Sequence, residues 1–155
     1  HRDLHSFPTR RSSDLLEEAR ERIDRLVNQN VLGYMLLKVQ GDIYMQMNKW
    51  DFALESFTSQ HIYSPSQIFP LIARANACLW RNHLSSAQEH LQFAKKMIQE
   101  EQKVMSMILL GRLGRILGEV KLNKDLGDYY FAMARYYARK GSYIDAIRNC
   151  KEGWS

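Results

Sequence analysis

Small side chains recur at a fixed interval along this chain. Ala19, Ala53 and Ala87 are evenly spaced, and each is followed four positions later by a larger apolar residue, namely Ile23, Phe57 and Leu91. Four residues make about one turn of an α-helix, so each pair shares one helix face. A repeat of about 34 residues, the interval seen here, is typical of proteins that stack copies of one structural unit. The recurrence therefore predicts a stack of similar helical units.

The clearest copy of the unit runs through residues 41–65. It contains Gly41, Tyr44, Ala53, Phe57 and Pro65. This spacing resembles the tetratricopeptide repeat, whose pattern is G-x-x-Y, then A-x-x-x-F, then P in a unit of about 34 residues. The resemblance implies two antiparallel helices that cross at the small residues, with the aromatic rings filling the seam. The proline ends the second helix, because it lacks an N–H group and clashes with the preceding turn.

The same positions can be followed through the rest of the chain. The resemblance implies an all-α fold, a right-handed α-solenoid of antiparallel helical hairpins. Beyond the clearest copy, the structural repeat positions are Ala75, Ala87, Leu91, Ala94, Ala134, Tyr137 and Ala146. Turns are predicted at residues 48–49, 81–83 and 141–142.

One tetratricopeptide-like domain is expected over residues 16–155. It comprises a half repeat (16–30), two complete repeats (34–67 and 68–101) and a final hairpin (127–155). Lys121 stands where the repeat interval requires a small residue. Residues 102–126 are therefore either a degenerate repeat or an inserted helix, and we expect a turn at 122–127.

The first fifteen residues resemble the translation of a common sequencing-adapter oligonucleotide. They read HRDLHSFPTRRSSDL. Segments of this origin are set aside before the fold is considered. Because residues 16–30 correspond to the second helix of a repeat without its first helix, we expect the chain to be a fragment of a longer array.

Composition and motifs exclude several classes of protein. Hydrophobic residues make up 45% and charged residues 25% of the chain, as in ordinary soluble globular proteins. No apolar run reaches the ~18 residues of a membrane span. Two cysteines, Cys78 and Cys150, are too few for a disulfide framework. The sequence contains no H-E-x-x-H pattern, phosphate-binding loop or nucleophile elbow. We therefore expect no enzymatic activity, no cofactor and no metal site. We expect the protein to be cytoplasmic, with the nucleus as the alternative compartment.

The resemblance also locates a candidate binding site. In tetratricopeptide-like stacks, the first helix of each hairpin lines a concave groove. The matching positions here are Met35, Lys38, Asp42, Met45, Phe69, Ile72, Asn76, Trp80, Phe131, Arg135 and Arg139. This set is apolar with a basic end, and the net charge of the chain is +5. An amphipathic helix or an extended peptide, including an acidic one, suits such a groove.

Three functions remain open from the sequence. The first is a non-enzymatic scaffold that binds other proteins in the groove. The second is RNA binding by a related helical repeat that recognises one base per unit. The third is a helical regulatory segment of a larger enzyme. The Gly41–Pro65 spacing and the apolar groove favour the scaffold, with protein partners and without nucleic acid.

Overall fold

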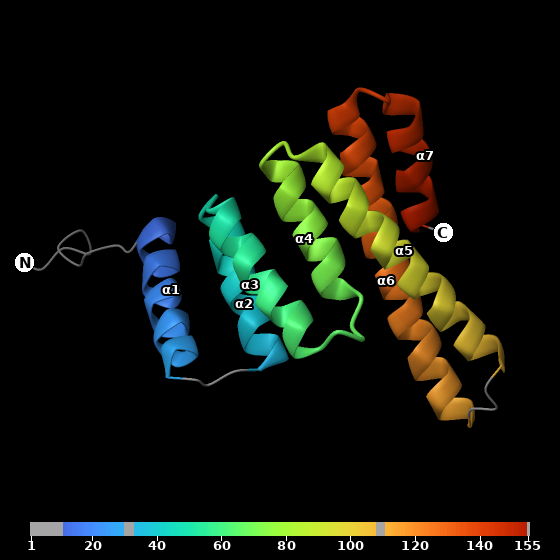
Figure 1. The fold of residues 1–155 in the computed structure, drawn as a ribbon, viewed down its shortest axis with the longest axis horizontal. Helices are drawn as coiled ribbons and strands as arrows, with labels where there is room; N and C mark the ends of the chain where they lie inside the picture. Colours follow the sequence, from blue (N-terminus) through green and yellow to red (C-terminus); the bar gives the residue numbers. More distant parts are fainter. Residues whose placement is uncertain (1–10, 30–32, 108–110, 155) are drawn as a thin grey trace, which may run out of the picture.

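The computed structural model describes residues 11–29, 33–107 and 111–154. In this part of the chain α-helices are the only regular secondary structure. Figure 1 shows the helices following one another across the molecule, so that each one packs against the next. They are α1 (Ser12–Asn28), α2 (Tyr34–Gln46), α3 (Trp50–Tyr63), α4 (Phe69–Trp80), α5 (Leu84–Met107), α6 (Arg112–Lys140) and α7 (Tyr143–Trp154). The all-α expectation is confirmed.

Three hairpins, α2–α3, α4–α5 and α6–α7, turn in the same way. Asn48 and Asn82 have φ of 58° and 62°, and Gly141 has φ of 89°. The amide after each of these residues donates to a carbonyl five positions earlier, as in Lys49 N to Tyr44 O at 2.9 Å. This is the Schellman ending of a helix, in which a left-handed residue satisfies the last carbonyls. The two asparagines are separated by one repeat interval, so the sequence repeat includes the turn residues as well as the core residues.

Close packing between α2 and α3 depends on Gly41. A Cβ atom at Gly41 would lie 2.8 Å from Cδ1 of Phe57, and Phe57 is only 2% exposed. Ala53 is fully buried in the same cluster, together with Tyr44 and Ala73 of α4. The small residues Gly41 and Ala53 therefore allow α2 and α3 to pack closely around the Phe57 ring.

A second and larger core lies between α4, α5 and α6. Ala75, Ala87, Leu91 and Ala94 are at most 1% exposed, and α6 adds Tyr129, Ala132 and Tyr136. Of the remaining structural repeat positions, Ala134 and Ala146 are buried, Tyr137 is half-buried against this core, and Pro65 is exposed just after the end of α3. This core makes α4–α6 the centre of the stack.

Three boundaries differ from the sequence expectations. Helix α5 continues to Met107, beyond the expected end of the second repeat at residue 101. The predicted turn at 122–127 is wrong, because α6 continues through it from Arg112 to Lys140. The long α6 runs beside the extended α5, and Figure 1 shows both projecting beyond the shorter helices. The third difference is that α1 begins at Ser12, inside the segment that resembles adapter sequence. Residues 1–10 of that segment lie outside the described part.

Candidate functional site

Helices α2, α4 and α6 place a set of cations and aromatic rings side by side. We call this surface the α2–α4–α6 face and define it by Lys38, Phe69, Asn76, Trp80, Lys124, Arg135 and Arg139. The repeat positions predict all of these residues except Lys124. The contacts that join them run between helices that are far apart in the sequence.

At one end of the face, two ammonium groups lie over the ring of Phe69. Lys38 Nζ is 4.9 Å from the centre of the Phe69 ring, and Lys124 Nζ is 5.7 Å from it. Each lysine also pairs with a carboxylate four residues later on its own helix, Asp42 or Asp128, both at 3.3 Å. Cations within about 6 Å of a ring centre are attracted by its π electrons. This end of the face is therefore internally charge-balanced.

At the other end, two arginines of α6 reach α4. Arg135 Nη1 donates to Asn76 Oδ1 at 3.1 Å. The Arg139 guanidinium lies 4.8 Å from the centre of the Trp80 ring, which stacks on Trp50 at 5.3 Å. Among the described residues, no carboxylate pairs with either arginine. Trp80 is still 50% exposed. This end therefore combines uncompensated positive charge with an accessible aromatic ring.

Four predicted groove residues are placed differently. Ile72 is wrong as a groove residue, because it is 2% exposed inside the α4–α6 core. Met45 packs on the core cluster between α2 and α3. Met35 is 60% exposed on α2, with no aromatic or ionic contact to the face among the described residues. Phe131 points toward α7, where its ring lies 3.1–3.3 Å from a Cβ atom built at Gly153.

Phe131 instead lines a pocket beside the face. This pocket lies between α6 and α7 and has a volume of about 640 Å³. Arg135 belongs both to the pocket and to the face, so the two surfaces are continuous. The exposed Trp154 of α7 forms part of the pocket wall.

The sequence prediction does not include Lys124. The expected turn at 122–127 contains this residue, so its side chain is not assigned to any helix face. Lys124, Arg135 and Arg139 are eleven and four residues apart, which is about three turns and one turn along one side of a continuous α6. Helical periodicity across Gly127 is the signal that could have found it.

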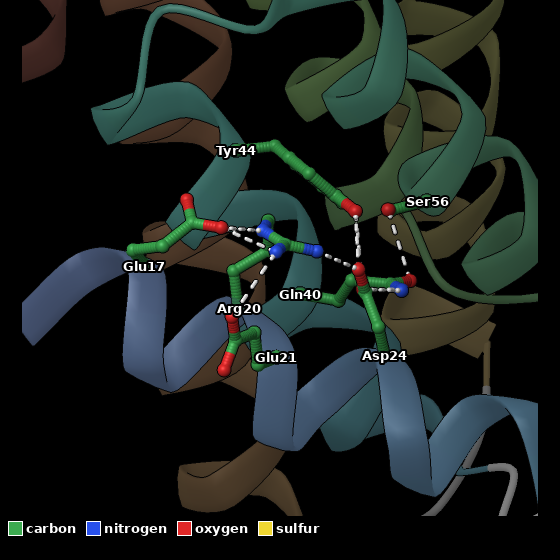
Figure 2. Close-up of polar contacts among 7 residues, drawn as sticks. All are labelled: Glu17, Arg20, Glu21, Asp24, Gln40, Tyr44 and Ser56. Carbon is green, nitrogen blue, oxygen red and sulfur yellow. Dashed lines mark hydrogen bonds and ion pairs between the residues drawn. The ribbon is translucent and has the colours of Figure 1, made fainter.

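A polar seam joins α1 to α2 and α3 (Figure 2). It consists of Arg20, Asp24, Gln40, Tyr44 and Ser56. The Asp24 carboxylate accepts from Arg20 Nη1 at 2.8 Å, from Gln40 Nε2 at 3.0 Å and from the Tyr44 hydroxyl at 2.9 Å. Ser56 Oγ donates to Gln40 Oε1 at 3.0 Å. Every residue of the seam thus has a hydrogen-bond partner inside the protein.

The charged groups of the seam are also paired. Arg20 pairs with Glu17 as well as Asp24, and these hydrogen bonds raise the pKa of Arg20. Burial, followed by the hydrogen bond to Asp24, raises the pKa of Tyr44. Asp24, Gln40, Tyr44 and Ser56 line a second pocket, of about 510 Å³, between α1, α2 and α3. The seam is a closed network that holds α1 in place.

Across residues 11–29, 33–107 and 111–154, no group of three or more His, Cys, Asp or Glu side chains is arranged to hold a metal ion. Within those same ranges, the helices fall short of the length and apolar character needed to cross a membrane.

Comparison with known proteins supports the fold. No protein-family model matches the chain, and no curated protein matches it. Among solved structures, "MamA MSR-1 C2" is similar, with a TM-score of 0.58 and 17% sequence identity over 91% of this chain and 67% of that one. MamA is a tetratricopeptide-type protein. The likeness shows that the present chain has a tetratricopeptide-like helical fold.

Proposed function

We propose that this chain is a non-enzymatic scaffold that binds a peptide or partner helix on the α2–α4–α6 face. The fold supports this, because stacked helical hairpins present extended surfaces suited to protein partners. The partner would bring a carboxylate to Arg135 and Arg139 and an apolar side chain to Trp80. It would bind in the cytoplasm or the nucleus.

The observation that carries the proposal is the open end of the face. Arg135 and Arg139 have no carboxylate partner among the described residues, whereas Lys38 and Lys124 each have one. Arginine and tryptophan are among the residues most enriched at the hot spots of protein interfaces, the few residues that contribute most of the binding energy. Here both types lie together on α4 and α6, and Trp80 remains half exposed.

The proposal can be tested with a displayed library of random twelve-residue peptides. The library is selected on the whole chain, and binding of each enriched peptide is then measured by fluorescence anisotropy. We expect enriched peptides to carry Asp or Glu next to an aromatic or aliphatic residue. Arg135→Ala and Trp80→Ala should each weaken binding about tenfold or more, as expected for interface residues that contribute about 1.4 kcal/mol or more.

A charge-matched control is available on the same helix. Arg112→Ala removes an exposed arginine at the start of α6, far along the helix from Arg135, and should leave binding unchanged. Enriched peptides without acidic residues, or equal binding by the wild type and Arg135→Ala, would refute the proposal. Salt-sensitive binding of single-stranded RNA that depends on Arg135 would favour the RNA-binding alternative.

A further inference from the structure

The polar seam has a counterpart one repeat unit further along the chain. The Asp24, Gln40, Tyr44 and Ser56 positions correspond, one repeat interval later, to Thr58, Arg74, Cys78 and His90. The helices correspond as well, because α3, α4 and α5 follow one another as α1, α2 and α3 do. His61 matches Val27, which lines the pocket beside the first seam. We call Thr58, His61, Arg74, Cys78 and His90 the Arg74 seam.

The Arg74 seam has a cation at the position of Gln40 but lacks the carboxylate. Thr58 stands at the position of Asp24, and its hydroxyl donates to the Leu54 carbonyl of its own helix at 2.7 Å. Nε of Arg74 and Nδ1 of His61 are buried without a hydrogen-bond partner among the described residues. Buried polar groups of this kind are normally satisfied, so each unsatisfied one requires an explanation.

Three groups that can carry positive charge lie within electrostatic reach of one another. Burial, and then the nearby Arg74 guanidinium, lower the pKa of His61 and of His90, the latter to about 4. Burial also lowers the pKa of Arg74 itself. Cys78, beside them on α4, is buried, and its pKa is raised mainly for that reason. Near neutral pH the two imidazoles are therefore uncharged, and the Arg74 guanidinium supplies the positive charge of the cluster.

Among the described residues, no carboxylate contributes to the pKa shifts of His61, Arg74 or His90. The acidic residue nearest in sequence to His90 is Glu89, which is exposed on α5 at the position that matches Glu55 at the rim of the first pocket. His61, Arg74 and His90 are each only partly buried as whole residues, so part of each side chain lies at the surface although Arg74 Nε and His61 Nδ1 are themselves covered. An anion of modest size could approach Arg74 from the side occupied by Asp24 in the first seam.

We propose that the Arg74 seam binds an oxyanion, a carboxylate or phosphate group, in place of the carboxylate that Asp24 supplies in the first seam. Arg74 would donate to the oxyanion, and His61 and His90 would flank it. This site is separate from the α2–α4–α6 face, because Arg74 and Asn76 are two residues apart and lie on opposite sides of α4. The inference does not depend on the proposed scaffold function.

The test measures anion-dependent stability and histidine titration in the whole chain. Sodium phosphate and sodium acetate are the two probes, and sodium chloride at the same ionic strength is the reference. At tenfold the dissociation constant, a bound anion should raise the Tm by about 3–6 °C. In the same titration the imidazole NMR signals of His61 and His90 should shift saturably, with their pKa values moving upward. The ratio of the phosphate and acetate responses distinguishes the two sources of oxyanion.

Two variants copy the first seam into the second. Arg74→Gln introduces the residue found at Gln40 and removes the cation, so the specific response to either anion should disappear. Thr58→Asp introduces the residue found at Asp24, so an internal carboxylate should occupy the site and abolish the response while raising the Tm in chloride. A response that persists in Arg74→Gln would overturn the proposal. A wild-type chain whose Tm and histidine signals respond to phosphate and acetate only as they do to chloride would overturn it as well.

Discussion

Gly41→Ala tests the claim that α2 and α3 require a residue without a side chain at their crossing. Alanine is favoured over glycine by about 1 kcal/mol in the interior of a helix, so propensity alone predicts stabilisation. The structure predicts the opposite, because a Cβ atom would lie 2.6 Å from Cζ and 2.8 Å from Cδ1 of Phe57. Phe57 cannot turn away easily, since it is 2% exposed and packs edge-on against Phe69.

The size of the effect follows from these two opposing contributions. Overpacking a core usually costs about 1–3 kcal/mol, and contact with several ring atoms favours the upper part of that range. After subtraction of the gain in helix propensity, Gly41→Ala should lower the free energy of unfolding by about 1–2 kcal/mol. Urea unfolding followed by far-ultraviolet circular dichroism measures this free energy, and an unchanged m-value would indicate that compactness is unaffected.

Gly127→Ala is the matched control for this substitution. Gly127 also lies inside a helix, but the nearest atom to a Cβ built there is the Gly153 carbonyl oxygen at 3.8 Å, an ordinary contact. This variant should gain up to about 1 kcal/mol. Combining Gly41→Ala with Phe57→Leu should relieve the clash and show a coupling of about 0.5 kcal/mol or more. A Gly41→Ala chain as stable as the wild type would refute the packing argument.

Three further outcomes are expected. Asp24→Asn should weaken the polar seam by about 1–3 kcal/mol, because the Tyr44 hydroxyl and its neighbours lose a charged acceptor; hydrogen exchange of the α1 amides measures the loss. Phe57→Ala should cost about 3–5 kcal/mol in urea unfolding through the cavity that it leaves. Burial holds the pKa of His90 at about 4, below the ~6.5 of the unfolded chain, so the unfolded state binds more protons between these values. The free energy of unfolding should therefore fall by about 1–2 kcal/mol as the pH is lowered from 6.5 to 4, because solvent screens part of the effect at this half-exposed ring, and His90→Gln should flatten this slope.

The sequence is informative wherever the signal is local. Of the three alanines that the repeat interval identifies, Ala53 and Ala87 are fully buried, whereas Ala19 at the end of the stack is only partly buried. The turns at Asn48 and Asn82 are found for the same reason, since asparagine accepts the left-handed conformation more readily than most residues. These features depend on a few neighbouring residues, so a single sequence carries them.

The misplaced turn at 122–127 shows where local signals fail. Gly127 lies in that stretch, but a glycine inside a helix costs only about 1 kcal/mol. Burial of Tyr129, Ala132 and Tyr136 against α4 and α5 outweighs this cost and keeps α6 continuous. The contact between Lys124 and Phe69 could therefore not be predicted from the sequence, because it exists only if Lys124 belongs to the same helix as these buried residues.

The error at Ile72 has a different physical origin. The predicted face of α4 extends from Phe69 to Trp80 with Ile72 and Asn76 between them. Positions three apart on a helix differ by about 60° in direction, so such a face is wide enough to include a residue that points into the core. Ile72 lies on the inner edge of that range, against the α4–α6 core, whereas Asn76 reaches Arg135. Repeat matching identifies the helix that lines a surface more reliably than it identifies the individual side chains.

The order in which the helices contact one another determines how far the loss of stability caused by a substitution extends through the stack. Each helix packs on the next one in the chain, and α4 with α6 is a further pair that skips a neighbour. Stability in such a stack is close to a sum of unit and neighbour contributions. Loss of the Asp24 carboxylate should therefore release α1 while the α4 and α5 amides around Leu91 keep their protection. Equal loss of protection in α1 and at Leu91 would show instead that the whole stack unfolds as one unit, and that the seam at α1 supports the core between α4 and α6.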